Sequence, residues 1–146
     1  MPPFQKILVP VDGSSTSTQA LDYALQLARD NHSQVRAMHA IDELGYLSGY
    51  EYSGQLVDAA RKSASEVLHK AVLAAQAAGV ALDTHLIDQP GQRLGQTVAD
   101  EAARWGADLV VTGTHGWRGV GRMLLGSGAE QIVRMAPVAV LTVRAD

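Results

Sequence analysis

Short apolar runs alternate with longer amphipathic segments along the whole chain. Five runs rich in valine, isoleucine, leucine and alanine are each bounded by turn residues, which predicts strands. These runs cover residues 6–11, 34–42, 80–87, 109–112 and 138–143. Between them, small or apolar residues recur every three or four positions, which predicts helices with one buried face. The helical segments cover residues 17–30, 56–78, 94–105 and 128–135.

The alternation of strand and helix predicts an α/β fold with a parallel sheet and, because crossovers are right-handed, helices on both faces. Residues 6–11 are apolar at nearly every position, as expected of a central strand covered on both faces. Residues 80–87 alternate more between apolar and polar and are expected at an edge. Residues 43–54 hold three tyrosines and three glycines without a clear period, which favours a loop.

Composition narrows the class of protein. The chain has 146 residues, 47% of them apolar and 18% charged, which fits a single domain over residues 1–146. A net charge of −3 argues against a nucleic-acid surface, which needs clustered lysine and arginine. There is no cysteine, so disulfides and thiolate chemistry are excluded. No apolar tract is long enough to span a membrane and the first residues do not form a signal peptide, so we expect a cytoplasmic protein.

A glycine-rich segment, residues 113–128, connects the fourth predicted strand to the last predicted helix. Five glycines fall between Gly113 and Gly126, whereas a turn requires one or two. Glycines let the backbone approach a phosphate, and the N–H groups at a helix start attract anions. The segment therefore favours a phosphate site. Residues 121–127 have the outline of a P-loop but lack its lysine, so we do not interpret them as one.

The spacing of this segment resembles the ATP-binding signature of the universal stress protein family. It reads Gly113, two residues, Gly116, nine residues, then Gly126-Ser127. Other segments that resemble the family are Ile7-Leu-Val-Pro-Val-Asp-Gly-Ser14, Ala107-Asp-Leu-Val-Val111 and Ala136-Pro-Val-Ala-Val-Leu-Thr-Val143. The resemblance runs along the whole chain. It implies a Rossmann-like five-stranded sheet in the order 3-2-1-4-5 and ATP binding in a regulatory or stress-protective role. The sequence shows no nucleophile–base pair or metal triad, so we expect at most slow ATP hydrolysis.

The family's strand order reverses between strands one and four, and ligands of such sheets bind where the order reverses. Asp12 follows strand one and Gly113 follows strand four, so strand order and glycine segment indicate the same place. The candidate nucleotide-binding residues are Pro10, Val11, Asp12, Ala40, Gly113, His115, Gly116, Arg118, Arg122, Gly126, Ser127, Gly128 and Ala129.

The resemblance implies a role for several of these residues, and each has a simpler structural alternative. Asp12 would accept a ribose hydroxyl or help hold Mg²⁺; alternatively, it makes local turn bonds. Ala40 would offer main-chain groups to adenine, although core packing alone would explain it. Gly126, Ser127 and Gly128 would present N–H groups to phosphates, which is compatible with a capped helix start. The family often has valine at the position of Gly128.

Charged side chains in the loop are also candidates. Arg118 and Arg122 would neutralise phosphate charge, or lie in solvent as single loop arginines. His115 invites a catalytic role, but the family usually has serine or arginine there, so ligand contact or exposure is favoured. The other histidines are His32, His39, His69 and His85, and their spacing matches no metal site.

Enzymes on the same fold, a nucleotide hydrolase or an adenylating enzyme, are the alternative function. An adenylating enzyme of the pyrophosphatase-loop kind would have Ser-Gly-Gly-x-Asp-Ser after strand one, where this chain has Pro10-Val-Asp-Gly-Ser-Ser15. A receiver domain needs an acidic pair after strand one and a lysine after strand five, and neither is present. The Gly-x-Gly-x-x-Gly of a dinucleotide-binding domain is also absent after strand one.

The last strand predicts a homodimer. The segment Val138 to Val143 is apolar at nearly every position, yet the implied strand order places it at a sheet edge. An open apolar edge strand is an aggregation hazard, and a two-fold axis would let two such edges pair antiparallel. Related stress proteins dimerise in this way. The alternative is that Pro137, Arg144 and Asp146 protect a solvated edge.

Overall fold

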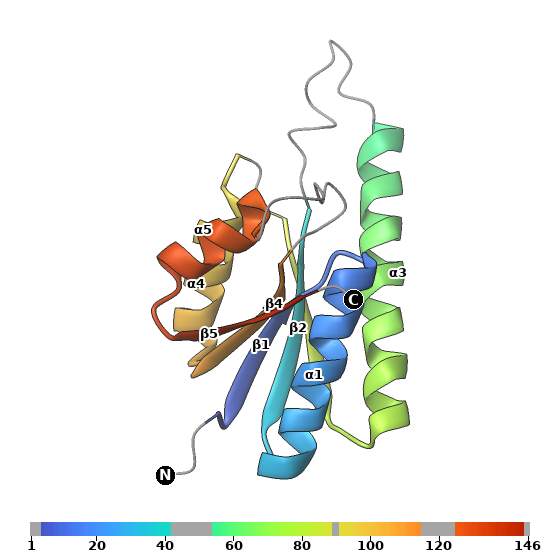
Figure 1. Cartoon of the computed structure of the whole chain (residues 1–146). Coiled ribbons are helices and arrows are strands. Elements are labelled where there is room, and N and C mark those ends of the chain that lie inside the picture. Colours follow the sequence, from blue (N-terminus) through green and yellow to red (C-terminus); the bar gives the residue numbers. More distant parts are fainter. Residues whose placement is uncertain (1–3, 42–53, 89–90, 115–124, 145–146) are drawn as a thin grey trace.

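The computed structural model describes residues 4–41, 54–88, 91–114 and 125–144. Five parallel strands form one sheet in the order β3-β2-β1-β4-β5, with helices on both faces (Figure 1). The elements are β1 (Lys6–Pro10), α1 (Ser15–Asn31), β2 (Gln34–Ala40), α3 (Gly54–Ala78), β3 (Leu82–Ile87), α4 (Leu94–Trp105), β4 (Leu109–Gly113), α5 (Ser127–Met135) and β5 (Ala139–Val143). The predicted fold class and strand order are confirmed.

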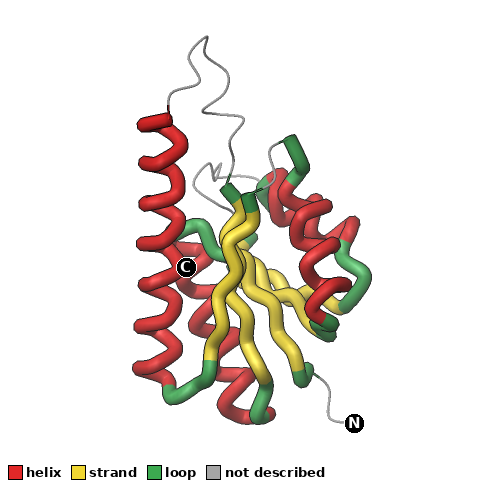
Figure 2. The backbone as a smooth tube through the Cα atoms, turned by 180° about the vertical axis from the view of Figure 1, so that it is seen from behind, coloured by secondary structure: helices red, strands yellow, loops and turns green. Residues whose placement is uncertain are grey.

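The sheet separates two layers of helices. α1 and α3 pack on one face, and α4 and α5 on the other (Figure 2). In β1, Ile7 and Val9 belong to the core on the α1 and α3 side, whereas Leu8 belongs to the core beneath α4 and α5. All three side chains are completely buried. A strand without a polar face is stable only when both faces are covered, which confirms the central position predicted for this run.

α1 begins at Ser15, two residues before the predicted start, because Ser14 caps it. The Ser14 hydroxyl accepts a hydrogen bond from the N–H of Ser17 at 3.3 Å. Thr16 and Ser17 are buried in the first turn despite being polar. A polar first turn has no apolar period, so the hydrophobic pattern begins later than the helix does.

α3 ends at Ala78 as predicted, with Gly79 in the left-handed region at φ 72°. The N–H of Gly79 donates to the Gln76 carbonyl, and that of Val80 to the Ala75 carbonyl. These are the two bonds of a Schellman motif, and they explain why β3 begins at Leu82 and not at Val80. At its other end α3 begins at Gly54, earlier than predicted; residues 43–53 of the predicted loop lie outside the described residues.

Asp108 fixes the start of β1 beside the start of β4. Its carboxylate accepts the N–H groups of Gln5 at 2.8 Å and Lys6 at 3.0 Å. Its own N–H donates to the Lys6 carbonyl at 2.9 Å. Because the two parallel strands are aligned here, their far ends also meet, at the opposite edge of the sheet.

β3 and β5 form the two side edges, as predicted. No helix within the described ranges has the length and apolar character needed to cross a membrane.

Candidate functional site

Most of the predicted site residues come together where β1, β2 and β4 end. The strands are parallel and paired, so their last residues share one edge of the sheet. The strand order reverses between β1 and β4, and α1 and α5 lie on opposite faces there. The described candidates at this edge are Pro10, Val11, Asp12, Ala40, Gly113, Gly126, Ser127, Gly128 and Ala129. Four other candidates, His115, Gly116, Arg118 and Arg122, lie outside the described residues.

Gly113 has a packing role. It is the last residue of β4 and is buried. A Cβ atom at this position would lie 2.9 Å from the carbonyl oxygen of Thr16, in the first turn of α1. Real Cβ atoms do not approach a backbone oxygen so closely, so glycine is needed for α1 to pack against β4. This contact accounts for Gly113 without a ligand, an explanation that the sequence pattern does not reveal.

The start of α5 has the geometry of an anion site. Gly126 is the N-cap, with extended backbone angles, and among the described residues no side chain makes a capping hydrogen bond to the helix. The first helical bond runs from the N–H of Glu130 to the Gly126 carbonyl. The N–H groups of Ser127, Gly128 and Ala129 precede it, and such groups have no acceptor within their own helix. Together with the helix dipole they favour a negative charge.

Gly128 lies where α5 meets α4. Its Cβ, if present, would lie 3.0 Å from the Cδ2 atom of Leu94, the first residue of α4. A valine would therefore require Leu94 to shift. Gly128 is part of α5, which begins at Ser127, so glycine at this position does not prevent the helix from starting there.

Asp12 makes the local bonds that the structural alternative predicts. Its Oδ1 accepts the N–H of Ser14 at 2.8 Å, and its own N–H donates to the Ser17 Oγ at 3.2 Å. The residue is partly buried. Carboxylate oxygens accept more than one hydrogen bond each, so this turn is compatible with a ligand contact. Within the described ranges, no group of three or more His, Asp or Glu side chains could hold a metal ion.

Thr114 connects the site to β5, and sequence reasoning missed it. It is buried, its N–H donates to the Val143 carbonyl at 3.0 Å, and its carbonyl accepts the N–H of Gly126 at 2.6 Å. The start of α5 is thereby held beside the ends of β4 and β5. A polar residue directly after a buried strand was the available signal.

His39 is a second residue that sequence reasoning missed. It is the penultimate residue of β2, and its Nδ1 lies 2.7 Å from the carbonyl oxygen of Val11. The spacing of the histidines matches no metal site, and a single histidine at a strand end carries no signal of its own in the sequence. Its position next to Ala40 was the only indication.

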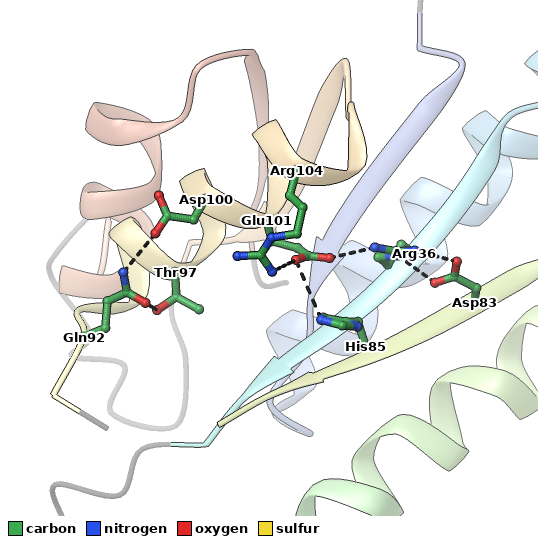
Figure 3. Close-up of polar contacts among 8 residues, drawn as sticks. All are labelled: Arg36, Asp83, His85, Gln92, Thr97, Asp100, Glu101 and Arg104. Carbon is green, nitrogen blue, oxygen red and sulfur yellow. Dashed lines mark hydrogen bonds and ion pairs between the residues drawn. The ribbon is translucent and has the colours of Figure 1, made fainter. Parts of the chain in front are cut away.

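A separate polar cluster lies under β2 and β3, along the strands and not at their ends (Figure 3). Glu101 of α4 is completely buried and accepts hydrogen bonds from Arg36 at 2.7 Å and Arg104 at 3.0 Å. Arg36 also forms two bonds to Asp83 of β3, at 2.7 and 3.0 Å. His85 Nε2 is 3.8 Å from Glu101 Oε1.

The cluster keeps Arg36 charged. Its hydrogen bonds to Asp83 raise the pKa of the guanidinium above its ordinary value, against the opposing effect of burial. The guanidinium carbon also lies 4.8 Å from the centre of the Trp105 ring. Glu101 follows Val98 by three residues on the apolar stripe of its helix, and that placement could have revealed a buried charge.

Comparisons with known proteins agree over almost the whole chain. The model of the universal stress protein family matches residues 3–144. A protein of Staphylococcus epidermidis named as a universal stress protein is 34% identical over 145 residues, which are 98% of this chain and 86% of that protein. A structure from this family in Burkholderia pseudomallei is 32% identical, with a TM-score of 0.77 over 97% of each chain. The hypothetical protein MJ0577 has a TM-score of 0.85 at 23% identity, over 99% of each chain.

Two other similar structures are described with a bound nucleotide. The universal stress protein of Archaeoglobus fulgidus in complex with dAMP has a TM-score of 0.72 at 22% identity, over 97% of this chain and 98% of that one. A family member from Arabidopsis thaliana with AMP bound has a TM-score of 0.69 at 18% identity, over 97% and 92%. At these identities the likeness concerns the fold alone. The family match and the 34% identical relative cover nearly all of the sequence, and this chain therefore belongs to the universal stress protein family.

Proposed function

We propose that this chain binds an adenine nucleotide, specifically ATP, and acts as a regulatory or stress-protective nucleotide-binding module. The observation that carries the proposal is the start of α5. Three consecutive N–H groups, those of residues 127–129, stand at a helix N-terminus beside the reversal of strand order, and no side chain in the described part of the chain caps that helix. Phosphate is the anion that such a helix start binds most often in doubly wound folds. Relatives of the same fold carry dAMP and AMP, which supports the nucleotide.

The remaining candidates fit the other parts of a nucleotide. Asp12, at the end of β1, would accept a ribose hydroxyl or share a Mg²⁺ ion with the phosphates; Mg²⁺ is commonly bound by one or two carboxylates plus phosphate oxygens. The main chain around Ala40, at the end of β2, would face the adenine. His115, Gly116, Arg118 and Arg122 would contribute from the loop between β4 and α5.

We expect binding with slow turnover at most. The loop lacks the lysine of a P-loop, and no described carboxylate is evidently placed to orient an attacking water. A nucleotide hydrolase or adenylating enzyme remains the alternative. Any ATP hydrolysis should be far below the enzyme median of about 10 per second, and multiple turnovers per second that an Asp12→Ala variant loses would favour that alternative.

The test is calorimetry with ATP and magnesium on the purified protein and on a Gly126→Val variant. We expect micromolar-range binding, with ADP and AMP weaker. Gly126 has φ −70° and ψ 167°, which any residue adopts, so valine adds a side chain at the phosphate position without straining the backbone. We expect Gly126→Val to abolish measurable binding at millimolar ATP while the protein still folds, with a slightly lower melting temperature because valine is a poorer N-cap than glycine.

A control is Ala81→Val, which also introduces a valine, at an exposed position before β3. This variant should bind ATP as the wild type does. The proposal is wrong if the wild type gives neither heat nor a thermal shift at millimolar ATP. If the Gly126→Val protein binds ATP with wild-type affinity, the nucleotide does not bind at the start of α5.

We also propose that two copies pair through β5 as a homodimer. The strand is an edge, and its sequence from Ala139 to Val143 has no charged residue. Ala139 and Leu141 are exposed on it, and Val133 and Met135 are exposed on the neighbouring α5. Antiparallel pairing of two such edges would satisfy their backbone groups and remove these side chains from water.

A further inference from the structure

We propose that His39 is a positioning residue of the nucleotide site: it holds the peptide group between Val11 and Asp12 and, through it, the Asp12 carboxylate. This inference rests on the proposed nucleotide binding. It concerns a side chain that no motif of the sequence singles out.

The peptide group between Val11 and Asp12 is held from both sides. Its carbonyl accepts a hydrogen bond from His39 of β2, and its N–H donates to the hydroxyl of Ser17 on α1. The preceding N–H, that of Val11, donates to the Met38 carbonyl at 2.8 Å. Next along the chain, the Val11 carbonyl receives a side chain of β2 where a longer strand would have supplied a backbone N–H.

The direction of the His39 bond is fixed by its partner. A carbonyl oxygen only accepts, so the hydrogen lies on Nδ1 of the imidazole. Both the neutral ring with this tautomer and the protonated ring carry that hydrogen. The role of His39 is therefore geometric and does not depend on a change of its charge.

The constraint passes directly to the carboxylate of Asp12. The Asp12 Cα is part of the held peptide group, and Oδ1 accepts the N–H of Ser14 on the other side. Without the donor from His39, the Val11 carbonyl would turn toward another partner because an unpaired, partly buried carbonyl is costly. That rotation would move the Asp12 Cα and change the direction in which its carboxylate meets a ribose.

The experiment compares ATP with 2′,3′-dideoxy-ATP, which lacks both ribose hydroxyls, by calorimetry. We expect the wild type to prefer ATP about tenfold, a typical effect of a hydrogen bond to a charged group. His39→Leu should reduce this preference to within about twofold, because the peptide group is released. His39→Asn should restore it, because the asparagine amide nitrogen stands as many bonds from Cα as Nδ1 does.

Controls separate positioning from stability. His69→Leu changes an exposed histidine on α3 and should keep the wild-type preference. In an Asp12→Ala background, His39→Leu should have no further effect on selectivity. If His39→Leu does not fold, His39→Gln replaces it, since the glutamine amide lies one bond farther out and does not match Nδ1.

Each result decides a different claim. A wild type that binds neither nucleotide overturns the proposed function. A wild type that binds both equally, or a His39→Leu protein that keeps the full preference for ATP, overturns the role of His39 and leaves nucleotide binding standing. A loss of thermal stability with unchanged selectivity would assign His39 to the fold alone.

Discussion

The two side edges of the sheet are built in opposite ways. β3 carries Asp83, Thr84 and His85 in succession, and the first and third of these belong to the charged cluster under the sheet. β5 reads Ala-Val-Leu-Thr-Val and has no charged residue before Arg144. Both strands have one open row of backbone groups, and such a row pairs readily with another strand. The chain therefore meets the same structural problem with two different sequences.

At β3 the chain protects the edge with its own side chains. Arg36 of β2 reaches outward to Asp83 with two hydrogen bonds and inward to Glu101 with a third. Charges along an edge discourage a second strand, because pairing would desolvate them. The strand is thereby tied to α4 from beneath (Figure 3).

At β5 the side chains divide between two environments. Val140 packs against the core beneath α4 and α5, and Val143 is buried on the other face. Leu141 is 37% exposed, close to the 36% of Leu86 on β3. Exposure of one leucine therefore does not distinguish the edges. The difference lies in the rest of each strand: β3 carries Asp83 and His85, whereas β5 has no charged residue, and this is the reason that we expect a partner only at β5.

The largest expected effect comes from removing the buried charge of Glu101, beneath β3. Glu101→Gln keeps the shape of the side chain but leaves Arg36 and Arg104 without their shared carboxylate. We expect a loss of about 3 kcal/mol in the free energy of unfolding, at the low end for a broken buried pair because Arg36 keeps Asp83 and Arg104 is largely in water. The melting temperature should fall by roughly 10 °C.

The matched control is Glu130→Gln, which breaks an exposed pair with Arg134 on α5 and should change stability little.

The pH dependence of the cluster's contribution to stability follows from Arg36. Its raised pKa means that its contribution is lost only as the pH rises through that value, far above neutral. Arg36 is thus charged at pH 6 and at pH 9, and wild-type stability in Glu101→Gln at either pH would contradict the structural role of the cluster.

Leucine-to-lysine changes at the two edges test the difference directly. Leu141→Lys should weaken the proposed dimer on the order of 100-fold, because both copies lose apolar burial and gain like charges that face each other. Leu86→Lys changes an equally exposed leucine on β3 and should leave the oligomeric state as it is. Light scattering across a concentration series measures both. Val140 is a poorer site for this test, since a lysine there would also disturb the core.

The dimer is ruled out if the wild type is a monomer at high micromolar concentration. A dimer that survives Leu141→Lys and dissociates with Leu86→Lys would reverse the assignment of the edges.

The helices and strands could be predicted well because each element leaves a local pattern in the sequence. The continuous apolar run of β1 and the glycine after α3 are examples. The predicted start of α1 is two residues late, because the polar first turn that follows the Ser14 cap has no apolar period. The glycine segment indicated the right edge of the sheet, since β4 and α5 do meet there.

The contacts that define the site were not predictable in the same way. His39 reaches Val11 across 28 positions, and Arg36 reaches Glu101 across 65. Such pairs depend on the register of the strands and on how each helix packs against them, which the pattern of one sequence does not reveal. Gly113 shows a related limit: a glycine needed for the approach of a helix looks the same in the sequence as one needed for a phosphate.

The smallest effect on stability is expected from a change of Asp83 on β3. Asp83→Asn removes the outer charge of the cluster while the inner pair of Arg36 and Glu101 remains. The Asp83 side chain is 54% exposed, so water screens its charge and we expect a loss of about 0.5 kcal/mol, reduced further by salt. Because Arg36 is the shared partner, Asp83→Asn combined with Glu101→Gln should cost more than the two single changes added together, since Arg36 is then left with no carboxylate from the cluster. Urea unfolding of the four proteins measures this coupling. Strict additivity would mean that Asp83 acts independently of the buried charge, and the protection of the β3 edge would then rest on solvation of Asp83 alone.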